Sequence, residues 1–171
     1  MAALVLAGAG LIALAAPALA ATDDVVLISR ATGPAGATVD ATAAISSASA
    51  SGEQVAFDTD ANNISAEDNN NFRNVFARDA ATNVTTFVSR ATGAAGTGGD
   101  GSSQDPSISG NGLVVTFESN ADNLSTEDNN AFTNVFVRDL AAGTTTLVSR
   151  ATGPGGAAGN ASSALTAADL G

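Results

Sequence analysis

Short runs of alternating apolar and polar residues recur along this chain and predict β-strands rather than helices. In the stretch 113–119, apolar side chains fall on alternate positions up to Phe117, while Val114 and Thr116 occupy the opposite face. Both faces of this strand are fairly apolar, which predicts that it is covered on both sides. Three neighbouring segments, 106–109, 134–139 and 144–150, predict three further strands.

The same pattern recurs with a period of 60 residues. The segments 61–79 and 121–139 are identical at 13 of 19 positions, and the tripeptide Ser-Arg-Ala begins at Ser29, Ser89 and Ser149. A fixed period of this size is typical of supersecondary units that stack on one another. The chain therefore predicts an array of four-stranded units.

Polar turn residues separate the segments and predict antiparallel hairpins. Between the third and fourth strands of the second repeat, Asp139 favours an Asx turn and Gly143 suits a left-handed backbone position. Asn83 stands at the equivalent position of the first repeat, and asparagine tolerates positive φ better than most residues. This replacement predicts a hairpin rather than a helix cap.

The first 20 residues do not belong to the repeat and predict export. An uncharged apolar run from Ala3 to Ala16 precedes Ala18 and Ala20, which form a small-x-small cleavage pattern. The alternative is a retained membrane anchor, but the run is shorter than the roughly 20 residues of a comfortable span. We expect a cleaved signal peptide and no membrane span after cleavage.

Four antiparallel strands per repeat, joined by short turns, are typical of a β-propeller blade. The second repeat reads SISxxGxxVxFxS and then NLSxxDNNxxxNVFVRDLxxGTTxLVSRATG, which resembles the TolB-type (WD-repeat-like) β-propeller repeat of secreted bacterial proteins. The resemblance covers about residues 23–171 and implies a propeller that serves as a binding platform. The positions that carry it are Gly112, Phe117, Asp128, Asn134, Val135, Phe136, Asp139, Gly143 and Val148.

The expected fold class is all-β, with two complete propeller-type blades plus partial ones, in an incomplete propeller. The expected organisation is a signal peptide at 1–20, the closing strand of a blade at 21–30, blade repeats at 31–90 and 91–150, and a truncated third repeat at 151–171. Because propellers have about four to eight blades, we expect the N-terminal part of a longer protein or an open stack that associates. Missing blades of a longer chain are therefore one expected partner.

Composition narrows the classes of function. Seventeen acidic residues against six basic ones give a net charge of −11, which argues against a nucleic-acid partner. Cysteine, histidine, lysine and tyrosine are absent, so general-base histidine, Schiff-base lysine and cysteine-nucleophile mechanisms are excluded. Any catalysis would have to use Asp, Glu, Ser, Thr or Arg.

The connection between the second and third strands is the candidate metal site. Carboxylate and amide oxygens spaced this densely suit Ca²⁺, which takes six to eight oxygen ligands. The alternative is that the same side chains close local turns through bonds to the backbone. The candidate ligands are Glu67, Asp68 and Asn70 in the first repeat and Glu127, Asp128 and Asn130 in the second.

Other recurrent residues are expected to be structural. We expect the arginines to pair with recurrent acids such as Asp79 and Asp139 or to cover blade edges. The phenylalanines of the strands are expected in the core, at Phe57, Phe76, Phe117 and Phe136.

The function that these observations favour is a non-enzymatic exported scaffold that binds a protein or a cell-envelope component. It would be secreted, periplasmic or on the bacterial cell surface, with no cofactor other than Ca²⁺ in the alternative case. Two alternatives stay open: a Ca²⁺-binding surface or adhesion array, and a fragment of a propeller hydrolase that uses Asp and Glu. Against the hydrolase, the acids repeat with the blades, whereas a catalytic pair is normally unique.

Overall fold

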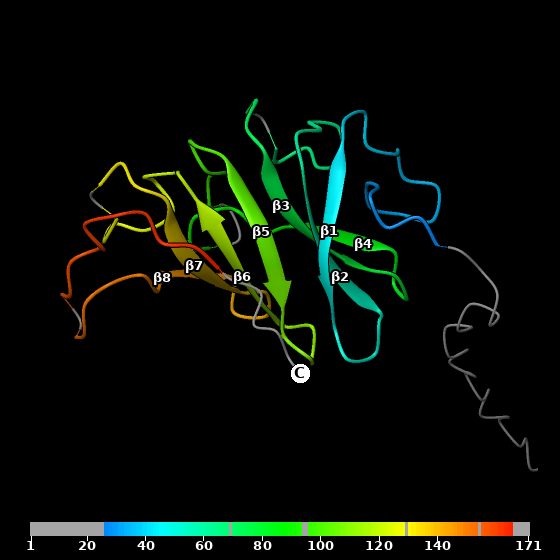
Figure 1. Cartoon of the computed structure of the whole chain (residues 1–171). Helices are drawn as coiled ribbons and strands as arrows, with labels where there is room; N and C mark the ends of the chain where they lie inside the picture. The colour runs from blue at the N-terminus through cyan, green and yellow to red at the C-terminus, as the bar shows by residue number, and fades with distance from the viewer. Residues whose placement is uncertain (1–25, 69, 94–95, 129, 154, 166–171) are drawn as a thin grey trace, which may run out of the picture.

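The computed structural model describes residues 26–165 except 69, 94–95, 129 and 154. The predicted signal peptide and parts of the segments 21–30 and 151–171 lie outside the described residues. Within them the secondary structure is entirely β, in two four-stranded antiparallel sheets, β1-β2-β3-β4 and β5-β6-β7-β8 (Figure 1). The strands are β1 Ala43–Ala48, β2 Gln54–Thr59, β3 Asn74–Asp79, β4 Val84–Phe87, β5 Ser103–Ile108, β6 Val114–Ser119, β7 Asn134–Asp139 and β8 Thr144–Leu147.

The predicted strands are confirmed, with shifted ends at two of them. The strand expected at 106–109 begins three residues earlier, where Ser103 pairs with Ser119 of β6 and its N–H donates to the carbonyl of Arg73, the residue before β3. The strand expected at 144–150 ends at Leu147. Pro106 lies inside β5, where the register with β6 shifts between Gln104 and Ser107. A bulge of this kind is one of the few places where a strand accepts proline.

The predicted hairpin between the third and fourth strands is also confirmed. Asn83 and Gly143 have φ of 61° and 67°, so both occupy the left-handed position that the turn requires. In each repeat an aspartate closes the turn: Asp79 Oδ1 accepts from Thr82 N at 2.8 Å, and Asp139 Oδ1 accepts from Ala142 N at 2.8 Å.

The two sheets pack against one another, and β5, the first strand of the second sheet, lies against β1, β2 and β3 (Figure 1). Phe117, Phe136 and Leu147 of the second sheet pack against the face of the first sheet that carries Val75 and Val88. The opposite face of the first sheet carries three stacked phenylalanine rings, and the N-terminal segment from Ile28 to Ala43 covers it. The four phenylalanines expected in the core are fully buried.

Coverage of the strands differs between the two sheets. In β2 every residue from Val55 to Thr59 is buried, so this strand is covered on both faces. In β6 Val115 and Phe117 are buried, whereas Val114 and Thr116 on the other face are only half-buried. The prediction that 113–119 is covered on both sides therefore holds only in part, because one face of the second sheet has less chain packed on it.

The prediction that the arginines pair with recurrent acids is confirmed for Arg90 and Arg150, which form ion pairs with glutamates of the two repeats, and is wrong for Arg78 and Arg138. Both side chains are buried and bond to carbonyl oxygens and a threonine hydroxyl instead. Carbonyl oxygens of the chain segment before each sheet converge on the guanidinium, and no sequence pattern revealed that arrangement. Among the described residues, no helix is both long and apolar enough to traverse a bilayer.

Candidate functional site

The candidate site is the loop between β2 and β3, together with the linker that follows β4. Arg90 leaves the end of the first sheet and forms an ion pair with Glu67. In the second repeat Arg150 forms the equivalent ion pair with Glu127. Glu67 is about half exposed, at 51%, so its carboxylate lies at the rim of the loop beside the linker.

Asp68 points inward and is buried. Its Oδ1 accepts a hydrogen bond of 3.0 Å from Asn74 Nδ2, whereas its Oδ2 is buried and accepts none from the described residues. Asp128 repeats this arrangement: Oδ1 accepts from Asn134 Nδ2 at 2.9 Å, and Oδ2 is likewise buried without a hydrogen bond. Burial raises the pKa of both carboxyl groups, and the hydrogen bonds from asparagine offset the rise only in part.

Asn70 connects the loop to the linker. Its Oδ1 accepts from Phe72 N at 2.8 Å and from Asn74 Nδ2 at 2.9 Å, and its Nδ2 donates to the carbonyl of Gly99 at 3.1 Å. Asn130 makes the same three kinds of bond in the second repeat, to Phe132 N, Asn134 Nδ2 and the carbonyl of Gly159. The loop and the linker are therefore joined in the same way twice.

Asn74 is the centre of the hydrogen-bond network in the first repeat, and Asn134 is its equivalent in the second; both are fully buried. Besides binding Asp68 and Asn70, Asn74 accepts through its Oδ1 a hydrogen bond of 3.0 Å from Ser89 Oγ, which itself accepts from Val75 N. Asn74 follows the acidic loop closely in the sequence, whereas Ser89 lies 15 residues further on and its role was not predicted. The only signal for it was that Ser29, Ser89 and Ser149 recur at the repeat period.

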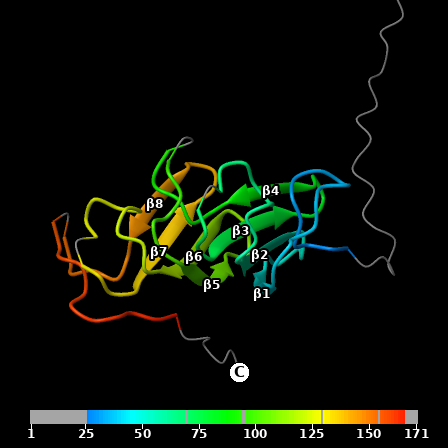
Figure 2. The same ribbon diagram turned by 90° about the horizontal axis from the view of Figure 1, so that it is seen from above.

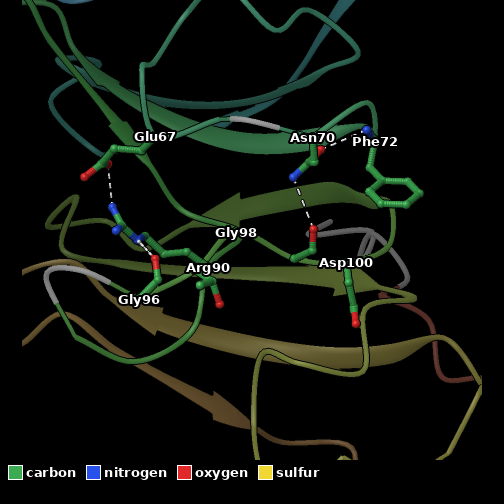
Figure 3. A pocket seen from close by; sticks show the side chains of 9 residues that line it. Glu67, Asn70, Phe72, Arg90, Gly96, Gly98 and Asp100 are labelled. Carbon is green, nitrogen blue, oxygen red and sulfur yellow. Dashed lines mark hydrogen bonds and ion pairs between the residues drawn. The ribbon is translucent and has the colours of Figure 1, made fainter.

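A cleft of about 460 Å³ opens where the loop meets the linker (Figure 3). The ion pair of Glu67 and Arg90 lies on one side and Phe72 on the other, and the linker backbone at Gly98 lies between them. Phe72 is 40% exposed, and Phe132, its equivalent in the second repeat, is 42% exposed. The Asn70–Phe72 bond fixes the backbone that carries this exposed ring.

The structure thus brings Asp68 and Asn70 together through Asn74 and turns Glu67 away toward Arg90. Within the described part of the chain, no three or more His, Cys, Asp or Glu side chains form a group that could hold a metal ion. An oxygen site here would need amide and backbone oxygens around the single buried carboxylate. Comparison of the chain with protein-family models, curated proteins and solved structures gave no match.

The buried acids predict a dependence of stability on pH. Burial raises the pKa of Asp58, Asp68 and Asp128, so the folded state binds protons more tightly than the unfolded state. The free energy of unfolding then rises as pH falls from above the folded pKa toward the unfolded value of about 4. We expect a higher melting temperature at about pH 5 than at about pH 7.5, measured by circular dichroism.

The double variant Asp68→Asn/Asp128→Asn should flatten this pH dependence, because it removes two of the three groups. Asp40→Asn, at an exposed position, is the matched control and should leave the dependence unchanged. Burial alone would raise the pKa of Asp79, but hydrogen bonds from Thr82 and Gln54 outweigh it and lower that pKa. The stability that Asp79 adds is therefore lost only at pH values below about 4, outside the range of this experiment. A melting temperature that falls steadily from pH 7.5 to pH 5 would contradict the prediction.

Proposed function

We propose that this chain is an exported, non-enzymatic scaffold, that its sheets are β-propeller-type blades of the TolB kind, and that it binds a protein or a cell-envelope component. The observation that carries the proposal is the contrast between the two kinds of recurrent residue in the loop. In the first repeat Asn74 donates hydrogen bonds to Asp68 and Asn70, and the equivalent residues of the second repeat make the same bonds. The phenylalanine beside this network is exposed in both repeats.

An exposed aromatic side chain on a fixed backbone favours recognition of another molecule. Aromatic residues are enriched in the energetic centres of interfaces, since they bury a large apolar area with few rotatable bonds. Phe72 and Phe132 occupy the same position in successive repeats, so they would present two equivalent contacts. The resemblance to TolB-type repeats implies the same kind of function, a binding platform outside the cytoplasm.

The test is co-sedimentation of the full chain with isolated bacterial cell envelopes that retain their proteins. We expect saturable binding that falls about tenfold or more in the Phe72→Ser/Phe132→Ser variant, as for loss of an aromatic centre. Val84→Ser removes an apolar side chain of similar exposure, 44%, and is the matched control. The absence of saturable binding, or an equal loss in the control, would contradict the proposal.

A Ca²⁺-stabilised surface array is the second candidate, and one observation favours it. Asp68 Oδ2 and Asp128 Oδ2 are buried at equivalent places and accept no hydrogen bond from the residues that the structure describes, and a buried carboxylate oxygen without a donor is costly unless a ligand or proton satisfies it. If Ca²⁺ binds there, adding it should raise the melting temperature by several degrees relative to a chelator.

The melting experiment also separates the two ways of satisfying these oxygens. A rise with Ca²⁺ that disappears in Asp68→Asn/Asp128→Asn, but persists in Asp40→Asn, would assign the metal to this loop. An identical melting temperature with Ca²⁺ and with chelator would contradict the calcium candidate. The loop would then be a set of turns that holds the exposed phenylalanine.

A further inference from the structure

The four residues Arg-Ala-Thr-Gly that span each repeat boundary form a segment, here called the RATG segment. This segment adopts the same conformation in all three copies. Its copies are 30–33, 90–93 and 150–153. The glycine has φ of 105°, 105° and 103° in the three copies. In each copy the alanine N–H donates to a carbonyl six residues on, at 2.8, 2.9 and 2.9 Å. The segment is therefore shaped by its own sequence.

The first two copies are docked on the fourth strand of a sheet. Thr32 Oγ1 donates to the carbonyl of Thr85 at 3.2 Å and accepts from Thr85 N at 3.1 Å. Thr92 makes the same pair of bonds to Thr145, at 3.1 and 3.0 Å. The buried arginine of each hairpin completes the contact, because Arg78 donates to the carbonyl of Ala31.

The third copy has the same conformation but an exposed surface. Ala151 and Gly153 are exposed, whereas Ala31, Gly33 and their counterparts in the second copy are partly covered. In the part of the chain that the structure describes, Thr152 makes neither of the bonds that Thr32 and Thr92 make. The third copy therefore has the conformation of a docked segment, with its threonine exposed to solvent.

The sheet face beside the third copy is open as well. Val88 is fully buried where the second sheet packs on the first, but Val148, 60 residues later, is 45% exposed. Val137 is half-buried, although its counterpart Ala77 is buried. This face continues the interface that the first sheet already forms with the second, and it lacks the phenylalanine face that would cover it.

We infer that this surface binds a second copy of the chain, head to tail, by exchange of equivalent segments. Residues 149–153 are identical in sequence to 29–33, the segment docked on the first sheet. In the assembly, residues 149–162 of one copy take the place of 29–42 on the first sheet of the next, and β1 stays in that sheet. The phenylalanine face of that sheet then packs on the face that carries Val137 and Val148.

The arrangement of the molecule permits this exchange. Residues 26–42 lie at the outer end of the first sheet and residues 155–160 at the outer end of the second, on opposite sides of the two-sheet stack (Figure 2). Residues 149–153 repeat the sequence of 29–33, so in the assembly they would make the bonds that Thr32 makes to Thr85, and exchange of equivalent segments is a low-cost route to association. Burial of the exposed valine face adds apolar contact that the separate chain lacks. Association should therefore depend on concentration.

The test is sedimentation velocity of the full chain over about a hundredfold range of concentration, which separates monomer from assembly by mass action. We expect a monomer at the low end and dimers or longer head-to-tail species at the high end. Thr152→Ala removes the two bonds of the incoming segment and should weaken association about tenfold. Its monomer should melt like the wild type, because Thr152 makes no such bonds there.

Thr32→Ala is the matched variant, with the opposite expected sign. It removes the same two bonds from the chain's own docked segment, which loosens that segment and favours its replacement by 149–162 of another copy. Association should therefore be stronger than in the wild type. A chain that stays monomeric at every concentration, or two variants that shift association in the same direction, would overturn the inference.

Discussion

We expect the Arg78→Met variant to lose about 2–4 kcal/mol of unfolding free energy, because it leaves several buried acceptors without donors at once. The guanidinium is fully buried. Its Nη1 donates to the carbonyl of Ala31 at 3.1 Å and to Thr85 Oγ1 at 2.9 Å, and its Nη2 donates to Asn83 Oδ1 at 3.0 Å. Methionine fills a similar volume but leaves these acceptors without donors.

Urea denaturation followed by circular dichroism measures this loss, and Arg78→Lys is the informative control. Lysine keeps the charge but not the planar fork that reaches acceptors on both sides, so it should recover only part of the stability. Arg138→Met tests the same contact in the second repeat, where the bonds go to the carbonyl of Ala91 and to Thr145. A loss below about 1 kcal/mol in both methionine variants would show that the buried bonds add little net stability.

Asn74→Ala should lose about 2–4 kcal/mol, because it leaves several buried polar groups unsatisfied at once. The Asn74 amide donates to Asp68 Oδ1 and Asn70 Oδ1, and its carbonyl oxygen accepts from Ser89 Oγ. Without it, the buried carboxylate of Asp68 loses a donor and the loop loses its connection to β3. We expect the midpoint of urea denaturation to fall, with the slope unchanged.

The neighbouring Asn71 is exposed and provides the matched control, since Asn71→Ala removes only its single surface bond, to Asn62. The double variant Asn74→Ala/Asp68→Ala should lose less than the sum of the two single variants, since each removes the other's partner. Strict additivity would contradict the network. It would mean that Asp68 and Asn74 contribute to stability independently.

Much of the fold could be predicted because it depends on local chemistry. Alternation of apolar residues predicts a strand within a few residues, and the exchange of Asn83 for Gly143 reports a left-handed turn whatever surrounds it. The 60-residue period also predicted that both repeats would build the same sheet. The shifted start of β5 was not predictable in this way, because it depends on the pairing of Ser103 with Ser119 and on a bond to Arg73, 30 residues earlier in the chain.

The sequence identified the residues of the candidate site but did not predict which hydrogen bonds and ion pairs they form. The density of Glu, Asp and Asn between the second and third strands marked the loop, but the sequence left both turn closure and metal ligation open. The structure directs Asp68 inward to Asn74 and Glu67 outward to Arg90. Those directions depend on β3 and on the linker after β4, which lie beside the loop only in the folded chain.

The sequence alone therefore determined the strands, the turns and the repeat, since each is set by residues close together in the chain. Only the tertiary structure decided where buried groups find partners. Arg78 meets the carbonyl of Ala31, 47 residues away, and nothing in the local sequence reports that contact. Val88 and Val148 stand in the same local pattern, yet one is buried and the other exposed, because burial depends on which sheet packs against each.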